Sequence, residues 1–274
     1  MDTKFFLGIV LAIVVVFAGA AVYSGLTKNQ TAVAAPAAGD RDVLYQVSTI
    51  DALMQGVFDG IRPVKEIRRQ GDFGIGTFDA LDGEMIVLDG VVYQAKADGR
   101  IYPADDRMTT PFATVTFFDQ DRTEVTEQPM NLSEFSSAME RRLPTGNMIY
   151  AVRMHGTFPS VKVRAIPAQH KPFPTLAEAS KNQSVYTYTN STGTVVGFFT
   201  PVFFRGVNVA GYHLHFISDD KKTGGHILDI TIPAHTTVVY DITPGFAMAL
   251  PTSGDFTGVD LSKDLTGDLA QIEK

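Results

Sequence analysis

Cysteine is absent from this chain, so disulfides, thiolate metal ligands and cysteine nucleophiles are all excluded. Long basic runs are absent as well, and the formal net charge is −7, so nothing in the sequence indicates nucleic-acid binding. No internal repeat at a solenoid period is present, which excludes a stacked-repeat architecture. A chain without cysteine is also compatible with an oxidising compartment.

The N-terminal segment has the features of an export signal. A short stretch carrying Lys4 precedes an uncharged apolar run, residues 5–26, which is about long enough to span a bilayer. A small, polar stretch follows over residues 28–40, and Ala32-Val33-Ala34 within it fits the small-x-small cleavage pattern. Residues 1–40 are therefore predicted to be a signal peptide, or an uncleaved membrane anchor with its tether. The predicted location is secreted, periplasmic or tethered to the outer face of the cell membrane.

Two less favoured explanations of this segment remain. A bacterial lipoprotein anchor is excluded because it needs a cysteine. A buried core helix at the N-terminus is disfavoured by the length of the run and its lack of charge. The sequence leaves open whether the segment is cleaved.

The rest of the chain predicts an α+β fold. The 274 residues are 45% hydrophobic, enough for a sizeable core in one large or two small domains. Helical spacing is found in the first half, at residues 49–58, 64–70 and 132–143, the last with Ser133 as candidate N-cap. Strands are predicted at residues 73–78, 84–88, 91–94, 112–118, 149–155, 160–166, 184–188, 193–199, 211–218, 226–232 and 235–242.

These elements predict two sheet-containing lobes, one with a mixed sheet and one with an antiparallel sheet. The Pro-rich break at residues 167–174 places the boundary, giving an N-terminal lobe over residues 41–175 and a β-rich lobe over residues 176–274. The polar stretch from Ser253 to the end resembles, by itself, a loose surface tail.

Three of the six histidines lie within sixteen residues, from Gly211 to His226. His213 and His215 point to the same side of a predicted strand because side chains alternate faces. The polar run at residues 218–225 predicts a hairpin turn, which places His226 roughly opposite His215. Three imidazoles on one face are typical of a metal site with room for a substrate, as in catalytic zinc. The alternative is that these are ordinary core or surface histidines, because a His-x-His pair alone is weak support.

A metal site that does chemistry usually needs a carboxylate for proton transfer, and a cation where the substrate is an anion. Glu84 is a candidate because it begins a strongly apolar strand. Arg164 shares a strand face with Lys162, and most such arginines are solvated. Residue chemistry alone does not select either of them.

Separated motifs resemble those of the α-acetolactate decarboxylases. Residues 77–90 (TFDALDGEMIVLDG), Tyr93-Gln94 and residues 111–113 (PFA) resemble the N-terminal half of that family. Residues 206–220 (GVNVAGYHLHFISDD) and Gly224-Gly225-His226 resemble its metal hairpin. The motifs match in order from about Leu44 to the C-terminus, so only the N-terminal segment falls outside the similarity.

The resemblance implies an enzyme that converts 2-acetolactate to acetoin and carbon dioxide with a bound zinc ion. It implies three metal ligands, three catalytic side chains and two pocket positions, which are His213, His215 and His226, then Glu84, Arg164 and Glu273, then Thr77 and Leu81. Zinc would chelate the hydroxyl and ketone oxygens of this small 2-hydroxy-3-keto acid, and the arginine would orient its carboxylate. One of the two glutamates would relay the proton. The resemblance also implies two α/β lobes and a homodimer.

Two other functions remain compatible with the motif. A cupin-like metal-dependent oxygenase or isomerase also carries His-x-His and a later His, but the glutamate expected soon after the pair is replaced by residues 218–222 (SDDKK). A non-catalytic, membrane-tethered binding module is the second alternative, disfavoured because the full set of ligands and catalytic residues is kept. The other histidines, His155, His170 and His235, show no partner spacing.

Overall fold

The computed structural model describes residues 41–273. The predicted export segment therefore lies outside the described residues, and residues 38–274 belong to one compact unit. Within the part of the chain that the structure describes, no helix is both long and apolar enough to cross a membrane.

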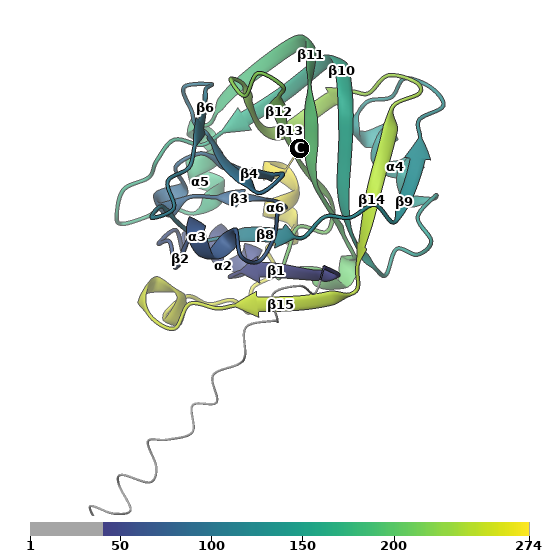
Figure 1. The fold of residues 1–274 in the computed structure, drawn as a ribbon. Helices are drawn as coiled ribbons and strands as arrows, with labels where there is room; N and C mark the ends of the chain where they lie inside the picture. Colours follow the sequence, from purple (N-terminus) through teal and green to yellow (C-terminus); the bar gives the residue numbers. More distant parts are fainter. Residues whose placement is uncertain (1–40, 274) are drawn as a thin grey trace, which may run out of the picture. The chain divides into compact units, whose positions relative to one another are not determined.

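Two large β-sheets organise the molecule (Figure 1). The first has seven strands in the order β15-β1-β8-β3-β4-β5-β6, and it is mixed because β1 runs parallel to β15 and antiparallel to β8. Its strands are β1 (Val43–Val47), β3 (Phe73–Thr77), β4 (Glu84–Leu88), β5 (Val91–Ala95), β6 (Ile101–Pro103), β8 (Ala113–Thr116) and β15 (Gly245–Ala249). A small separate sheet pairs β2 (Arg62–Pro63) with β7 (Thr109–Thr110).

The second sheet is antiparallel and has six strands in the order β11-β12-β13-β10-β14-β9. Its strands are β9 (Arg122–Val125), β10 (Ile149–Ala165), β11 (Ser184–Thr200), β12 (Gly211–Ser218), β13 (Gly224–Thr231) and β14 (Thr237–Thr243). The predicted α+β class with a mixed and an antiparallel sheet is confirmed. The sheets do not follow the predicted lobe limits of 41–175 and 176–274, because β9 and β10 join the second sheet and β15 joins the first.

Short helices cover the sheet faces and fill the space beside the sheets. They are α2 (Ile50–Met54), α3 (Val64–Ile67), α4 (Leu132–Glu140), α5 (Leu176–Ala179) and α6 (Thr266–Ile272), with 3₁₀ turns η1 (Asp79–Leu81), η2 (Ser180–Asn182), η3 (Val202–Phe204) and η4 (Gly254–Thr257). The predicted helix at residues 132–143 is confirmed, but its N-cap is Asn131, which forms a capping box with Glu134, rather than Ser133.

Apolar side chains from both sheets form a shared core. Ile75 and Ile86 of the first sheet pack with Ala151, Val196 and Ile217 of the second. The opposite face of the second sheet is covered by α4, through Phe135 and Met139. Side-chain alternation along each strand therefore gives the second sheet two buried faces, which suits its long apolar strands.

Three sequence predictions of local structure were wrong. The helix predicted over residues 49–58 ends at Met54, and the apolar residues just before it form β1. The strands predicted at 149–155 and 160–166 are one strand, β10, and those at 184–188 and 193–199 are one strand, β11. Gly156 and Pro159 suggested a turn, but Gly156 pairs with Gly193, and the register has no partner for Pro159, which lacks an amide proton.

Candidate metal centre

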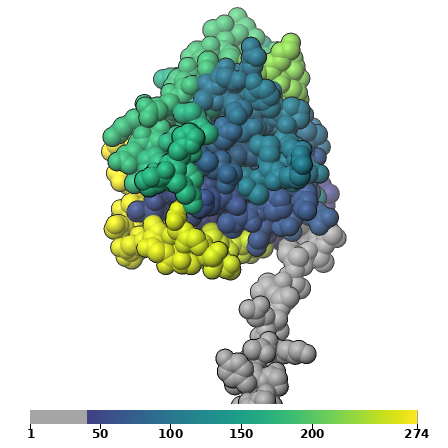
Figure 2. Space-filling view, turned by 90° about the vertical axis from the view of Figure 1, so that its left-hand side faces the viewer, coloured from purple at the N-terminus to yellow at the C-terminus, as the bar shows by residue number. Residues whose placement is uncertain are grey.

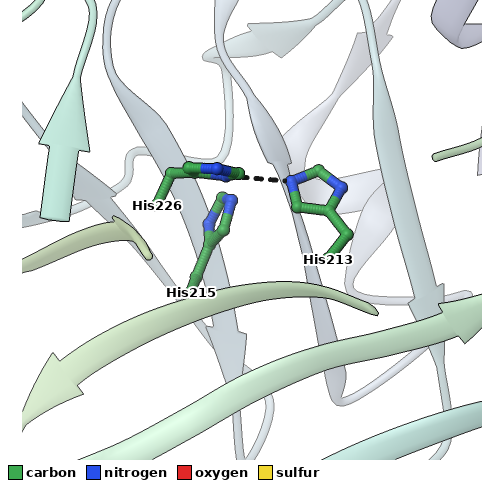
Figure 3. Close-up of side chains that lie close together, drawn as sticks. All are labelled: His213, His215 and His226. Carbon is green, nitrogen blue, oxygen red and sulfur yellow. Dashed lines mark hydrogen bonds between the residues drawn. The ribbon is translucent and has the colours of Figure 1, made fainter. Parts of the chain in front are cut away.

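The three histidines predicted to converge do so between the two sheets. β12 carries His213 and His215, and β13 carries His226, which is the direct cross-strand partner of His215. The predicted hairpin register is therefore confirmed. One ring nitrogen from each residue lies within 4.8 Å of the others, and Figure 3 shows the three rings facing one another.

Burial keeps these imidazoles neutral, which is the form that binds a metal ion. His215 and His226 are 0% and 2% exposed, and His213 is 9% exposed. Desolvation is the main cause that lowers the pKa of all three, and the Arg164 guanidinium lowers each further. For His213, the Glu273 carboxylate acts in the opposite direction.

Unpartnered ring nitrogens show that this cluster fits a metal ion. The Nδ1 atom of His215 lies 2.9 Å from the Met85 carbonyl, so it carries the proton and donates, which leaves Nε2 bare. That Nε2 is buried without a hydrogen-bond partner, as are Nδ1 of His213 and Nε2 of His226. The remaining nitrogens, Nε2 of His213 and Nδ1 of His226, lie 3.2 Å apart. Buried polar atoms in native proteins are rarely left unpaired, and a cation among these nitrogens would satisfy them.

Two carboxylates and one guanidinium lie directly beside the histidines. Arg164 donates from Nη1 to Oε1 of Glu84 at 2.9 Å and from Nη2 to Oε1 of Glu273 at 3.3 Å. The second oxygen of Glu84 lies 3.9 Å from His215 Nε2. The second oxygen of Glu273 lies 3.7 Å from His213 Nε2 and 3.6 Å from His226 Nε2. Each carboxylate therefore spans the gap between the arginine and the histidine cluster.

Strand pairing explains how residues far apart in sequence meet here. Arg164 is the cross-strand partner of His226, and Glu84 begins β4, on the facing sheet. Gly225 has φ 146° and its Cα faces the Arg164 carbonyl so closely that a Cβ would clash with it. A glycine before His226 therefore lets β13 approach β10 at the site.

The local field holds a proton near neutrality on one carboxyl. Burial raises the pKa of Glu84 to about 7, opposed by Arg164 and reinforced by the Glu273 carboxylate. Glu84 is 7% exposed, so desolvation outweighs the ion pair with the guanidinium. A carboxyl with such a pKa exchanges protons readily at physiological pH.

Thr77 and Leu81, the predicted pocket residues, lie at one small cavity together with Glu84, Arg164, His213 and Glu273. Its volume is about 30 Å³, room for little more than water. The Thr77 hydroxyl donates to the Gly83 carbonyl at 2.7 Å and holds the β3–β4 turn. A substrate therefore needs side chains to move before it reaches the histidines.

The turn beside this cavity is strained. Ala80 and Leu81 have φ of 57° and 60°, in the left-handed region that side-chain-bearing residues rarely adopt. Backbone hydrogen bonds hold the turn, from the Ala80 amide to the Phe58 carbonyl and from the Gly83 amide to the Ile166 carbonyl. Strain of this kind persists where surrounding structure fixes the residue, and it places Leu81 against the cavity.

The C-terminal residues are not the loose tail that their polarity suggested. α6 buries Leu269 and Ile272 among apolar residues that include Ile50, Leu53 and Leu176. Glu273 is the C-cap residue of α6, and the fold brings it back between the sheets (Figure 1). Figure 2 shows the preceding segment, in yellow, running along the lower surface beside the dark blue N-terminal elements.

Sequence reasoning missed one contributor, Met85, whose carbonyl orients His215. Only its position next to Glu84 in an apolar strand could have indicated it. The histidines left outside the predicted site are also outside the observed one. His155 pairs with Asp219 at 3.1 Å on the surface, and His170 and His235 are exposed.

Comparison with known proteins agrees with the geometry. Residues 44–263 match the profile of the family described as Alpha-acetolactate decarboxylase. A protein of that name from Methanosarcina mazei is 51% identical over 233 residues, covering 85% of this chain and 81% of the relative. One from Bacillus licheniformis is 40% identical, covering 85% of this chain and 92% of the relative.

The fold agrees as well. The solved structure of alpha-acetolactate decarboxylase from Bacillus subtilis strain 168 superposes with a TM-score of 0.81 at 38% identity, covering 84% of this chain and 99% of the other. The matched segment includes all three clustered histidines, Glu84 and Arg164, whereas Glu273 lies beyond the profile match. The chain belongs to the alpha-acetolactate decarboxylase family, a family of carboxy-lyases.

Proposed function

We propose that this protein decarboxylates 2-acetolactate to acetoin and carbon dioxide and that the reaction depends on zinc. Family membership supports the reaction class. The observation that carries the proposal is the buried histidine cluster with Glu84, Arg164 and Glu273 directly beside it.

His213, His215 and His226 hold the metal in this proposal. Three neutral imidazoles that leave a further coordination position open suit a catalytic zinc ion. Once bound, the cation supplies Lewis-acid stabilisation of the negative charge that develops on the ketone oxygen as carbon dioxide leaves. Met85 supports the ligand set, because its carbonyl fixes the His215 tautomer.

Arg164 binds and orients the substrate carboxylate. Its guanidinium is buried, and its Nε–H has no hydrogen-bond partner in the protein, so a donor remains for the substrate. A planar guanidinium recognises a carboxylate through two parallel hydrogen bonds, which fixes the direction in which the carbon–carbon bond breaks. Its hold on both glutamates also keeps them at the reacting carbon.

Glu84 or Glu273 delivers the proton that replaces the lost carboxylate. The two carboxyls approach the histidine cluster from different elements, β4 and the end of α6. Protonation from one fixed side gives a chiral product. Glu84→Gln and Glu273→Gln separate the two roles, since the variant that loses control of the acetoin enantiomer contains the relay residue. Unchanged enantiomeric composition in both variants would show that neither glutamate delivers the proton.

An acetoin assay with racemic 2-acetolactate tests the whole proposal, with metal analysis of the same purified protein before and after chelation. The expected result is about one zinc per chain and acetoin formation that chelation abolishes and zinc restores. Bound metal without acetoin would refute the substrate, and oxygen consumption would favour the cupin-like alternative. His155→Ala is a matched control for His215→Ala, because it removes a surface histidine and should leave zinc content unchanged.

The proposal extends to location and assembly. We propose an exported homodimer, on the basis of the apolar run at residues 5–26 and the family resemblance. Cell fractionation tests the first, and light scattering tests the second. Activity confined to the cytoplasm, or a monomeric active enzyme, would refute them respectively.

A further inference from the structure

A second cluster of metal-compatible side chains lies outside the histidine site. Oxygens of Asp42, Asp119 and Asp241 all lie within 4.8 Å of one another. They come from three places: the residue before β1, the loop between β8 and β9, and β14. The cluster marks the place where β14 leads into β15 and β15 pairs with β1, a connection visible in Figure 1.

Asp241 is the unusual member because it is completely buried. Its exposed fraction is 0%, and neither carboxylate oxygen has a hydrogen-bond partner. On β14, Val238 and Tyr240 belong to the core covered by α4, so alternation turns Asp241 to the opposite side, toward the first sheet. An aspartate with both oxygens buried and unpaired is costly unless a proton or a cation compensates it.

The neighbouring charges increase that cost. Oδ1 of Asp119 is also buried without a partner, while its Oδ2 lies 3.2 Å from Arg41 Nε. Among the salt bridges of residues 41–273, Arg41 is the only cation paired with any of the three aspartates. Asp121 lies close by and accepts the Ile242 amide at 2.8 Å. The site therefore gathers more negative charge than its single arginine balances.

Titration behaviour agrees with the geometry. Burial raises the pKa of Asp241 to about 8, and Asp119, Asp121 and Asp42 raise it further. The backbone amide of Asp119 acts in the opposite direction. Without a cation, this carboxyl therefore keeps its proton at neutral pH.

We propose that Asp42, Asp119 and Asp241 form a binding site for a hard divalent cation, of which calcium is the best match. All the side-chain donors are carboxylate oxygens, the ligands that calcium prefers, and no nitrogen or sulfur donor favours a transition metal. Asp42 is exposed, which gives the ion a path from solvent. Bound there, the ion fastens the start of β1 and the β8–β9 loop to β14.

The role is structural and independent of the catalytic proposal. The Asp42 carbonyl accepts the Gly245 amide at 2.9 Å, so this residue already contributes to the β1–β15 pairing. An ion bridging Asp42 to Asp241 would tie the same junction through side chains. Calcium at the millimolar level typical outside cells would occupy a site of modest affinity, with a dissociation constant of about 10⁻⁴–10⁻³ M.

Thermal unfolding of the full chain, loaded with zinc beforehand, tests the site with calcium chloride alone as the probe. At 10 mM calcium the midpoint should rise by roughly 3–10 °C, from the expected affinity and the size of the protein. Equilibrium dialysis should find calcium bound at the same concentrations. Loading with zinc keeps the histidine site constant, so the shift reports on the aspartates.

Three variants locate the effect. Asp241→Asn and Asp119→Asn should abolish the calcium shift, and the exposed Asp42→Asn should weaken binding by about 10-fold or more. Asp260→Asn, an exposed aspartate on the C-terminal segment, is the matched control and should keep the full shift. Asp42→Asn keeps the test decisive if either buried variant fails to fold.

Two outcomes would overturn the proposal. The first is no calcium-dependent shift in the wild-type chain, which would leave a protonated Asp241 as the full account of the cluster. The second is an equal shift in wild type, Asp42→Asn and Asp241→Asn, which would place the calcium elsewhere.

Discussion

Replacing Arg164 is the most informative perturbation of the candidate site. The side chain is 4% exposed and donates to two buried carboxylates, Glu84 at 2.9 Å and Glu273 at 3.3 Å. Arg164→Ala removes the proposed clamp on the substrate carboxylate and also the charge that holds the glutamates in place. Two consequences are therefore expected, one for catalysis and one for stability.

The catalytic loss can be estimated from the hydrogen bonds involved. A bidentate guanidinium–carboxylate contact consists of two charge-assisted hydrogen bonds of about 1.5–3 kcal/mol each. Losing about 3 kcal/mol of transition-state stabilisation lowers the rate by roughly 100-fold, and larger losses lower it further. We therefore expect kcat/KM for 2-acetolactate to fall by at least about 100-fold in Arg164→Ala.

The stability loss has a separate cause. Removing one partner of a buried ion pair leaves uncompensated charge, at a cost of about 3–5 kcal/mol. Protonation of Glu84 limits that cost, because its pKa already lies at about 7. Arg164→Lys keeps the charge without the planar fork, so it should recover more stability than activity.

Steady-state kinetics with the zinc content of each variant provide the measurement. Lys162→Ala is the matched control, since Lys162 lies two residues away on the same strand and is exposed. The reasoning is refuted if Arg164→Ala binds zinc, stays folded and decarboxylates within a few-fold of wild type. Equal losses in Lys162→Ala would instead indicate a general disturbance of β10.

Three further predictions concern the ligands, the C-terminal helix and the aspartate cluster. His226→Ala should lose zinc and acetoin formation together, and elemental analysis showing retained zinc would contradict its role as a ligand. Leu269→Ala should lower activity by at least about 10-fold with zinc retained, because undocking α6 withdraws Glu273 from the site; exposed Gln271→Ala on the same helix should have no effect, and equal activity in the two variants would contradict this function of α6. In calcium-free buffer, Asp241 should make unfolding easier as pH rises from about 4 to about 8, since the unfolded chain releases this proton near pH 3.8 and the folded chain near pH 8. The slope is at most about 1.4 kcal/mol per pH unit. Denaturant unfolding of Asp241→Asn should lack that component, and identical pH profiles for the two proteins would show that Asp241 is ionised in the fold.

The histidine hairpin could be predicted because its information is local. Alternation along β12 and the polar turn before β13 suffice to place His215 opposite His226, and the structure has this register. The same reasoning failed for β10 and β11. Their length depends on pairing with each other over 17 residues each, and that pairing overrides the turn preference of Gly156 and Pro159.

The sequence by itself determined the α+β class, the histidine hairpin and, through its motifs, the family. Each of these depends on spacing within one or two neighbouring elements, which the order of residues records directly. Only the tertiary structure decided that Arg164 is buried between Glu84 and Glu273, and that Asp42, Asp119 and Asp241 meet. Burial and charge proximity are properties of segments brought together across the fold, 80 residues apart for Arg164 and Glu84 and 109 for Arg164 and Glu273. No local pattern encodes them, because the free energy that fixes them comes from packing the two sheets together.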